Sequence, residues 1–206
     1  NQALQTVERY KTSFDEVMLT LNEFEFEDIV TVENVVKAIQ RAELMMRVVV
    51  EVESYIIELG DEGRLVDLQL KELSSNVEND ELLIIRDYSL TKEREEDLLG
   101  DISKLSHQEL MDSNNIAKMF GYSAETTLEN IEVTTRGYRQ LSRIPKLPMN
   151  IIDNMVKALG NFQDIIRASI EELDEVEGIG EVRAKNIKQG IKRMQEQALY
   201  DSRYYR

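Results

Sequence analysis

The sequence contains no cysteine and only one histidine, His107, among its 206 residues. Without cysteine the chain has no disulfide, no thiolate zinc site and no cysteine nucleophile, and a single histidine excludes a histidine-rich metal site. The longest apolar run, Leu82 to Ile85, is far shorter than the roughly 18 residues of a membrane-spanning helix. No signal-peptide pattern opens the sequence. These absences predict a soluble, cytoplasmic protein without a membrane partner.

Acidic and basic residues are unevenly distributed along the chain, whose formal net charge is −15. Residues 1–135 contain 30 acidic and 12 basic side chains, a net charge of −18. Residues 136–206 contain 10 acidic and 13 basic side chains, a net charge of +3. This asymmetry predicts two modules with different partners, an acidic body and a mildly basic C-terminal module.

Proline is absent from the acidic body, because both prolines, Pro145 and Pro148, lie in the C-terminal module. Long proline-free, glycine-poor stretches rich in Glu, Leu, Lys and Gln favour helix. Near the N-terminus, apolar residues recur at alternating three- and four-residue steps, which predicts one buried stripe along a first helix. The stripe consists of Leu4, Val7, Tyr10, Phe14, Val17, Leu21 and Phe24.

Two more long helices are predicted after the first. Thr31 can cap a helix that continues to Leu59, where Gly60 offers a C-terminal stop. A third helix is predicted from Leu65 to Tyr88, with its apolar run deep in a bundle. Helices of about 25 residues span roughly 37 Å. We therefore expect residues 1–135 to form an elongated all-α bundle.

The most informative motif lies near the C-terminus, where the sequence has the spacing Leu173-x-x-Val176-x-Gly178-Ile179-Gly180 followed by Ala184 and Ile187. A helix is expected to end here, two glycines to form a tight hairpin around a buried isoleucine, and a second helix to start near Glu181. Glycine tolerates positive φ and close backbone approach. The helix N-terminus beyond the turn favours an anion.

This arrangement resembles the helix-hairpin-helix motif, which binds the DNA backbone without reading base sequence. Backbone N–H groups and nearby cations would hold a phosphate oxygen. The alternative is a purely structural turn between two helices. The residues assigned to DNA are Gly178, Ile179, Gly180, Val182, Arg183, Lys185 and Lys188.

A degenerate second hairpin is predicted upstream, from Leu141 to Pro148. Pro148 suits a helix start, but it has no N–H to offer a phosphate. Arg143 and Lys146 remain able to contact DNA through their side chains. Both interpretations stay open: this hairpin is structural, or it is a second DNA contact. Two hairpins of this kind over residues 137–198 have the length of a tandem helix-hairpin-helix domain.

Several segments together resemble the C-terminal part of the bacterial DisA family of DNA integrity scanning proteins. In the C-terminal module these are residues 136–139 (Arg-Gly-Tyr-Arg), 144–148 (Ile-Pro-Lys-Leu-Pro) and 173–184. In the acidic body, residues 1–11, 59–65 and 121–122 are similar to the family's linker region. The resemblance covers essentially the whole chain.

The resemblance implies a helical spine followed by a DNA-binding tail. In that family an N-terminal diadenylate cyclase domain precedes them, and the octamer recognises branched DNA and lowers cyclic di-AMP synthesis there. The family's Asp-Gly-Ala and Arg-His-Arg cyclase motifs are absent from this sequence. We therefore interpret the chain as a C-terminal fragment without enzymatic activity or cofactor of its own. ATP and a divalent metal would belong to the missing domain.

Other candidate residues favour structural roles. His107 lies between Ser106 and Glu109, whose Ser-x-x-Glu spacing predicts a capping box at a helix start, and Gly121 is expected to end a following helix. No acidic loop or Glu-x-x-His pair with metal-ligand spacing occurs, so no metal or catalytic residue is predicted.

The fold class predicted is all-α: an elongated bundle over 1–135 and a tandem helix-hairpin-helix domain over 136–206. The predicted function is sequence-independent binding of DNA backbone, in a nucleoid-associated homo-oligomer when the protein is full-length. The alternative is a helical protein-interaction or oligomerisation module whose hairpins only brace helices. The acidic body favours that alternative because it should repel DNA.

Overall fold

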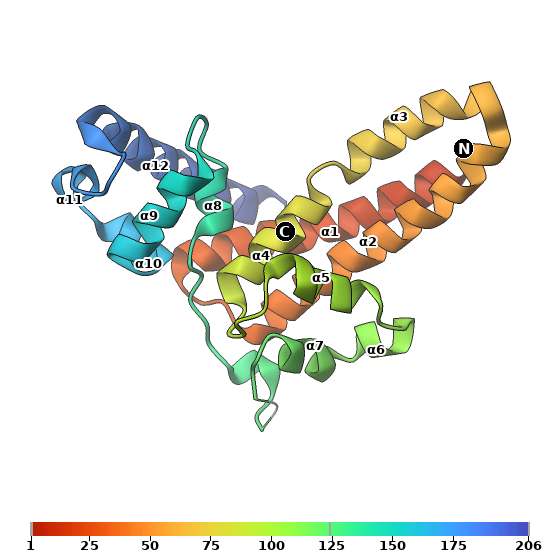
Figure 1. Cartoon of the computed structure of the whole chain (residues 1–206), viewed down its shortest axis with the longest axis horizontal. Helices are drawn as coiled ribbons and strands as arrows, with labels where there is room; N and C mark the ends of the chain where they lie inside the picture. The colour runs from red at the N-terminus through yellow and green to blue at the C-terminus, as the bar shows by residue number, and fades with distance from the viewer. Residues whose placement is uncertain (1, 124, 206) are drawn as a thin grey trace.

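The computed structural model describes residues 2–123 and 125–205, and over them it confirms the all-α prediction. The only β pairing in these ranges is an isolated bridge between Thr31 and Glu132. Two long helices form the spine of the molecule, α1 (Gln2–Glu27) and α2 (Val32–Leu59). Figure 1 shows them side by side along the long axis.

The predicted apolar stripe of α1 is part of the first hydrophobic core. Val7, Phe14 and Leu21 are buried there together with the apolar face of α2. The start of α2 at Thr31 is confirmed, but the capping contacts go to Asn34. The Asn34 Oδ1 accepts from the Thr31 N–H at 2.8 Å and from the Thr31 hydroxyl at 3.0 Å.

The third predicted helix is interrupted, and the prediction of one helix from Leu65 to Tyr88 is wrong. After α2 ends at Leu59, a 3-10 turn η1 (Gly60–Glu62) leads into α3 (Gly63–Ser74), and a separate α4 (Val77–Tyr88) follows. The break lies at Asn76, whose φ of 72° is left-handed. Asn tolerates this conformation better than most residues, so the chain can turn here without glycine.

Short helices cover one side of the bundle, below the spine in Figure 1. The predicted capping box is present, because the Ser106 hydroxyl accepts from the Glu109 N–H at 3.1 Å and Glu109 accepts from the Ser106 N–H at 3.0 Å. Gly121, at φ 91°, follows the last of these α-helices as predicted. The elements are α5 (Glu95–Ser103), α6 (His107–Met111), α7 (Ser113–Met119) and the 3-10 turn η2 (Leu128–Asn130).

The C-terminal helices gather at the opposite end of the molecule from the α2–α3 tip (Figure 1). They form a second hydrophobic core, which also includes Phe26 of α1 and Leu83 of α4. The last helix lies against α1. The elements are α8 (Tyr138–Ser142), α9 (Met149–Leu159), α10 (Phe162–Arg167), α11 (Ile170–Asp174) and α12 (Gly180–Tyr204).

Buried polar residues join the two cores. Arg139 of α8 pairs with Glu25 of α1, and both side chains are almost fully buried. Asp87 of α4 accepts from the first two N–H groups of α8, those of Tyr138 at 2.7 Å and Arg139 at 3.1 Å. The C-terminal helices are thus held to the bundle by specific contacts. A domain boundary at residue 135 stays a prediction.

No helix in the described ranges is both long and apolar enough to cross a membrane.

Candidate nucleic-acid interface

The glycine hairpin lies between α11 and α12, where the sequence predicts it. Gly178 and Gly180 have φ of 87° and 67°, in the left-handed region. A Cβ on Gly178 would collide with the Ile151 Cδ1, which would have to shift, and the positive φ strains any side chain at this position. A Cβ on Gly180 would meet open space, so glycine is required there by backbone conformation alone. Ile179, 6% exposed, packs into the second core between them.

The hairpin presents the N-terminus of the 25-residue helix α12. None of the described side chains caps this end. The first N–H groups of an α-helix have no partner within the helix, and here they follow directly on the open space beside Gly180. Val182, in this first turn, is 75% exposed. The arrangement therefore offers backbone donors and the positive end of the helix dipole to an anion from solvent.

Two of the predicted cations lie beside this helix end. Arg183 donates from Nη1 to the Gly178 carbonyl at 2.7 Å, which holds its guanidinium against the hairpin. Lys185 is exposed and pairs with Glu181 at 3.1 Å. An exposed pair of this kind contributes little to stability, so Lys185 can exchange Glu181 for a phosphate at small cost.

Lys188 has a different environment. Its Nζ donates to the Ile166 carbonyl at 3.0 Å and to the Ala168 carbonyl at 2.7 Å, at the C-terminal end of α10. A lysine in this position satisfies carbonyls that the helix leaves unpaired. The structure therefore gives Lys188 a structural role, holding α12 to the end of α10, which the sequence does not indicate. Lys185 differs from it because its side chain is exposed to solvent.

The upstream hairpin repeats the glycine hairpin in register. The buried Leu141, Ile144 and Ile152 correspond to Leu173, Val176 and Ala184. In the same register Lys146 replaces Gly178, and its φ of 60° is also left-handed. Pro148 replaces Gly180 and is the N-cap of α9. The upstream turn thus keeps the left-handed backbone at its first position without glycine, but Pro148 has φ −68° where Gly180 has φ 67°.

The two cations assigned to the upstream hairpin differ in environment. Arg143 is exposed and donates to the Gln140 Oε1 at 2.7 Å, and partial desolvation together with nearby Arg139 lowers its pKa. Lys146 lies in the exposed turn itself. In the register of Lys185 this hairpin has Asp153, which accepts from Lys157 at 2.7 Å, the Tyr138 hydroxyl at 2.6 Å and Arg86 at 3.3 Å.

The hydrogen bond from Lys157, followed by the one from the Tyr138 hydroxyl, lowers the pKa of Asp153. These contacts therefore favour the anionic form of Asp153. A carboxylate where the other hairpin has a lysine weakens phosphate binding, and Arg86 ties this carboxylate to α4. The upstream hairpin is thus built into the contact with the bundle. The two hairpins also pack on each other, since the Asn154 Nδ2 donates to the Glu177 carbonyl at 3.1 Å.

No described residues form a group of three or more histidine or acidic side chains arranged to hold a metal ion. His107 is the exposed first residue of α6. Two polar features escape the sequence analysis. One is the Glu25, Asp87 and Arg139 network, and the other is a pair of buried glutamates, Glu43 and Glu81. The only sequence signal for Glu81 is its position directly before the apolar run at 82–85.

Comparison with known families matches both parts of the chain. Residues 1–129 match the family model described as "DisA bacterial checkpoint controller linker region", and residues 161–189 match the "Helix-hairpin-helix motif" model. The second match contains the glycine hairpin.

Curated relatives agree with both family matches. The chain is 52% identical over 204 residues to the DNA integrity scanning protein DisA of Acetivibrio thermocellus, covering 98% of this chain and 57% of that protein. It is 46% identical over 202 residues to DisA of Carboxydothermus hydrogenoformans, covering 97% and 57%. The chain thus spans little more than half the length of these relatives, and its matched parts are a linker and a helix-hairpin-helix motif rather than a cyclase domain. The chain belongs to the DisA family, and it carries the linker region of that family followed by the helix-hairpin-helix motif.

Proposed function

We propose that this chain binds DNA by its phosphate backbone at the Gly178–Gly180 hairpin and serves as the DNA-sensing part of a longer protein. The observation that carries the proposal is the uncapped N-terminus of α12, flanked by the exposed Val182 and Lys185. The helix-hairpin-helix match over 161–189 and the relatives' name, which refers to DNA integrity scanning, support it.

The chemistry of the hairpin favours backbone binding over base readout. Its donors are main-chain N–H groups on a convex turn, and such contacts to phosphate carry no sequence information. One hairpin meets few phosphates, and neutralising about three predicts a log–log salt slope near −3. A single copy should therefore bind with a Kd of roughly 10⁻⁴ to 10⁻⁶ M.

The test is a fluorescence-anisotropy titration of labelled duplex at two salt concentrations. Val182→Glu adds an anion to the phosphate site, yet an acidic residue in the first turn of a helix does not destabilise it. Lys185→Gln removes one cation, and Lys118→Gln, at an exposed position of α7, is the control with the same change of charge. We expect the two hairpin variants to bind at least about tenfold more weakly and Lys118→Gln to bind like the parent. Equal binding by all three would make the hairpin structural.

The same proposal extends to the full-length protein. We propose that it assembles into an oligomer, prefers branched DNA and lowers the activity of its cyclase domain when DNA is bound. Several hairpins held in one oligomer would bind a junction more tightly than a linear duplex without any new contact. Exposed apolar side chains near the α2–α3 tip favour assembly, since Ile57, Leu65 and Leu68 are 84%, 67% and 64% exposed. In the cell, such a protein would be associated with the nucleoid.

These proposals are tested on the full-length protein. A four-way junction should compete better than a matched duplex and should lower cyclic di-AMP synthesis from ATP and a divalent metal. Light scattering should show an oligomer. If the full-length protein is monomeric and binds junction and duplex equally, the proposal that copy number confers structural preference fails.

A further inference from the structure

A cavity of about 520 Å³ opens between α2, α4 and α5, in the acidic bundle and apart from the hairpins. Its walls are mainly apolar, contributed by Met46, Val50, Leu82 and Leu99. A volume of this size is in the range that holds small ligands. No residue of the C-terminal helices lines it.

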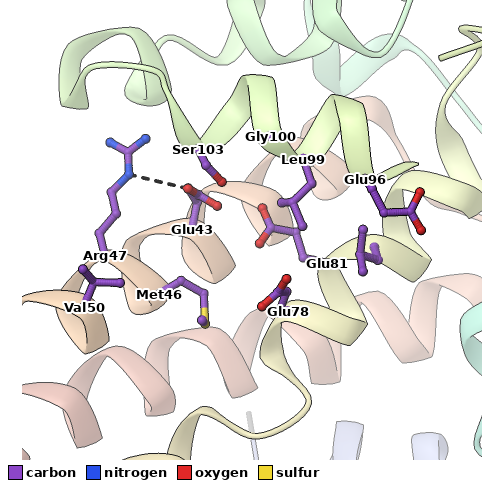
Figure 2. Close-up of a pocket in the computed structure, with 11 residues that line it drawn as sticks. Glu43, Met46, Arg47, Val50, Glu78, Glu81, Glu96, Leu99, Gly100 and Ser103 are labelled. Carbon is purple, nitrogen blue, oxygen red and sulfur yellow. Dashed lines mark ion pairs between the residues drawn. The ribbon is translucent and has the colours of Figure 1, made fainter. Parts of the chain in front are cut away.

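Two carboxylates occupy the inner wall of this cavity. Glu43 of α2 and Glu81 of α4 are 3% and 1% exposed, and Figure 2 shows their carboxylates directed toward one another between the helices. Glu43 has a cation, Arg47, at 3.7 Å. Among the described residues, no donor reaches either buried oxygen of Glu81, and the polar group beside it is the carboxylate of Glu43. A buried polar group without a partner is costly and uncommon.

Arg47 does not compensate for Glu81, because its guanidinium is engaged elsewhere. Its Nη2 donates to the Leu105 carbonyl at 2.8 Å and the Ile102 carbonyl at 3.3 Å. Burial, followed by the charge of Glu43, raises the pKa of Glu81 well above its ordinary value. Arg47 is thus the cation of the cavity lining, and it pairs with Glu43 rather than with Glu81. The outer lining adds two exposed carboxylates, Glu78 and Glu96.

We propose that this cavity binds an aliphatic amine with at least two ammonium groups. One ammonium group donates to Glu81 and Glu43 and satisfies the unpaired oxygens. The methylene chain lies along Met46, Val50 and Leu82, which bury it from water. A second ammonium group reaches the exposed carboxylates of Glu78 and Glu96. The methylene chain of such a ligand therefore matches the apolar walls, and its two ammonium groups match the inner and the outer pairs of glutamates.

Other ligand classes fit less well. A hydrated metal ion gains nothing from apolar walls, and hard cations require several converging oxygen ligands. An anion would be repelled by the glutamates. A neutral alcohol would fill the walls but leave the charge of Glu81 without compensation. The strongest competing interpretation is a proton: Glu81 stays neutral and shares a hydrogen bond with Glu43, and the cavity binds no ligand.

Isothermal titration calorimetry of the whole chain distinguishes these interpretations. The probes are cadaverine and spermidine, with pentanol and Mg²⁺ as the neutral and metal controls. Titrations at about pH 6 and about pH 8, in two buffers that differ in ionisation enthalpy, report any proton released when the ammonium displaces it from Glu81. Glu81→Gln removes the buried charge, and Glu58→Gln, on the exposed end of the same helix as Glu43, is the matched control.

We expect saturable one-to-one binding of a diamine or polyamine with proton release at the lower pH. Glu81→Gln should weaken it by about tenfold or more, since a charged hydrogen bond is lost, and Glu58→Gln should leave it unchanged. Amine binding that is equal in Glu81→Gln, or preferential binding of Mg²⁺ or pentanol, would overturn the proposal. The absence of saturable amine binding by the folded parent would establish the proton interpretation instead. DNA titrations of Glu81→Gln should match the parent, so this site and the hairpin are tested separately.

Discussion

Arg139 and Glu25 form their ion pair where almost no water reaches either side chain. Arg139 also donates to the Asn22 Oδ1 at 2.7 Å, and Gln140 donates to the Glu25 Oε1 at 2.8 Å. Removing one partner of such a pair leaves the other charge buried without compensation, which costs far more than the net contribution of the intact pair. The pair is therefore a specific requirement of the contact between α1 and α8.

Arg139→Met should lower the free energy of unfolding by about 3 to 5 kcal/mol, because Glu25 is left buried and charged. Adding Glu25→Gln to that variant should recover part of the loss. Urea denaturation measures both, and Arg193→Met, at an exposed position of α12, provides a control with an expected effect of about 0.5 kcal/mol or less. A double variant no more stable than Arg139→Met would show that packing, rather than charge, explains the loss.

The stability of the contact between α4 and α8 depends on pH through Asp87. Burial, followed by the charge of Glu25, raises the pKa of Asp87 to about 7. In the unfolded chain the group titrates near its ordinary value, so between the two pKa values the folded protein binds more protons. The contribution of Asp87 to stability is therefore fully present at low pH and is lost as the pH rises through about 7.

The free energy of unfolding should fall between about pH 5 and pH 8, and Asp87→Asn should reduce that fall by up to about 3 kcal/mol. The quantity to compare is the slope of the free energy of unfolding against pH. Absolute stability is not informative here, because asparagine has a single acceptor oxygen for the two α8 N–H groups and so loses stability at every pH. Chemical denaturation at several pH values measures it. Asp174→Asn, at an exposed site, should keep the parent's slope, and an unchanged slope in Asp87→Asn would show that Asp87 stays ionised.

Among the helices, α3 and α4 are separated by Ser75, whose ψ is 137°, and by the left-handed Asn76. Asn76 adopts φ 72°, a conformation in which Cβ is strained for most residues but not for glycine. Asn76→Ala should lower the free energy of unfolding by about 1 kcal/mol, whereas Asn76→Gly should be neutral or slightly stabilising. Thermal denaturation of the two variants checks this. Equal stability of both would mean that α3 and α4 can join into one helix without cost.

The helices show which features are predictable from sequence. The stripe through Val7, Phe14 and Leu21 and the hairpin at Gly178–Gly180 are local patterns, and the structure contains both. The break at Asn76 has no such signal, because asparagine also occurs within helices. Contacts between distant residues are the least predictable: Arg139 and Glu25 are 114 positions apart. The sequence likewise does not distinguish Lys188 from a surface cation, because the two carbonyls beside it come from the end of α10.

At the scale of the whole molecule, the hairpin domain and the bundle share their interiors. The second core includes Phe26 and Leu83 from the bundle, and α12 packs along α1. The charge network of Glu25, Asp87 and Arg139 lies at the same contact. The hairpin helices are thus joined to α1 and α4 by a shared core and buried polar contacts rather than by a linker alone.

This shared interior predicts that residues 1–135 alone are helical but less stable than the whole chain. Without the C-terminal helices, Phe26 and Leu83 lose their burial, which contributes about 1.5 to 3 kcal/mol for each side chain. Glu25 and Asp87 then face water without Arg139 or the α8 N–H groups, so their loss is smaller than that of a buried unpaired charge. Urea denaturation followed by circular dichroism measures the difference, with an expected loss of about 3 to 6 kcal/mol.

Substitution of the two shared apolar residues separates this effect from any general effect of shortening the chain. Phe26→Gln with Leu83→Gln should destabilise the whole chain strongly, because both side chains are buried there. In residues 1–135 the same pair should change the free energy of unfolding by about 0.5 kcal/mol or less, as expected for surface positions. A fragment as stable as the whole chain would show that the two cores are energetically independent. The packing of the hairpin helices on the bundle would then add nothing to the stability of the bundle.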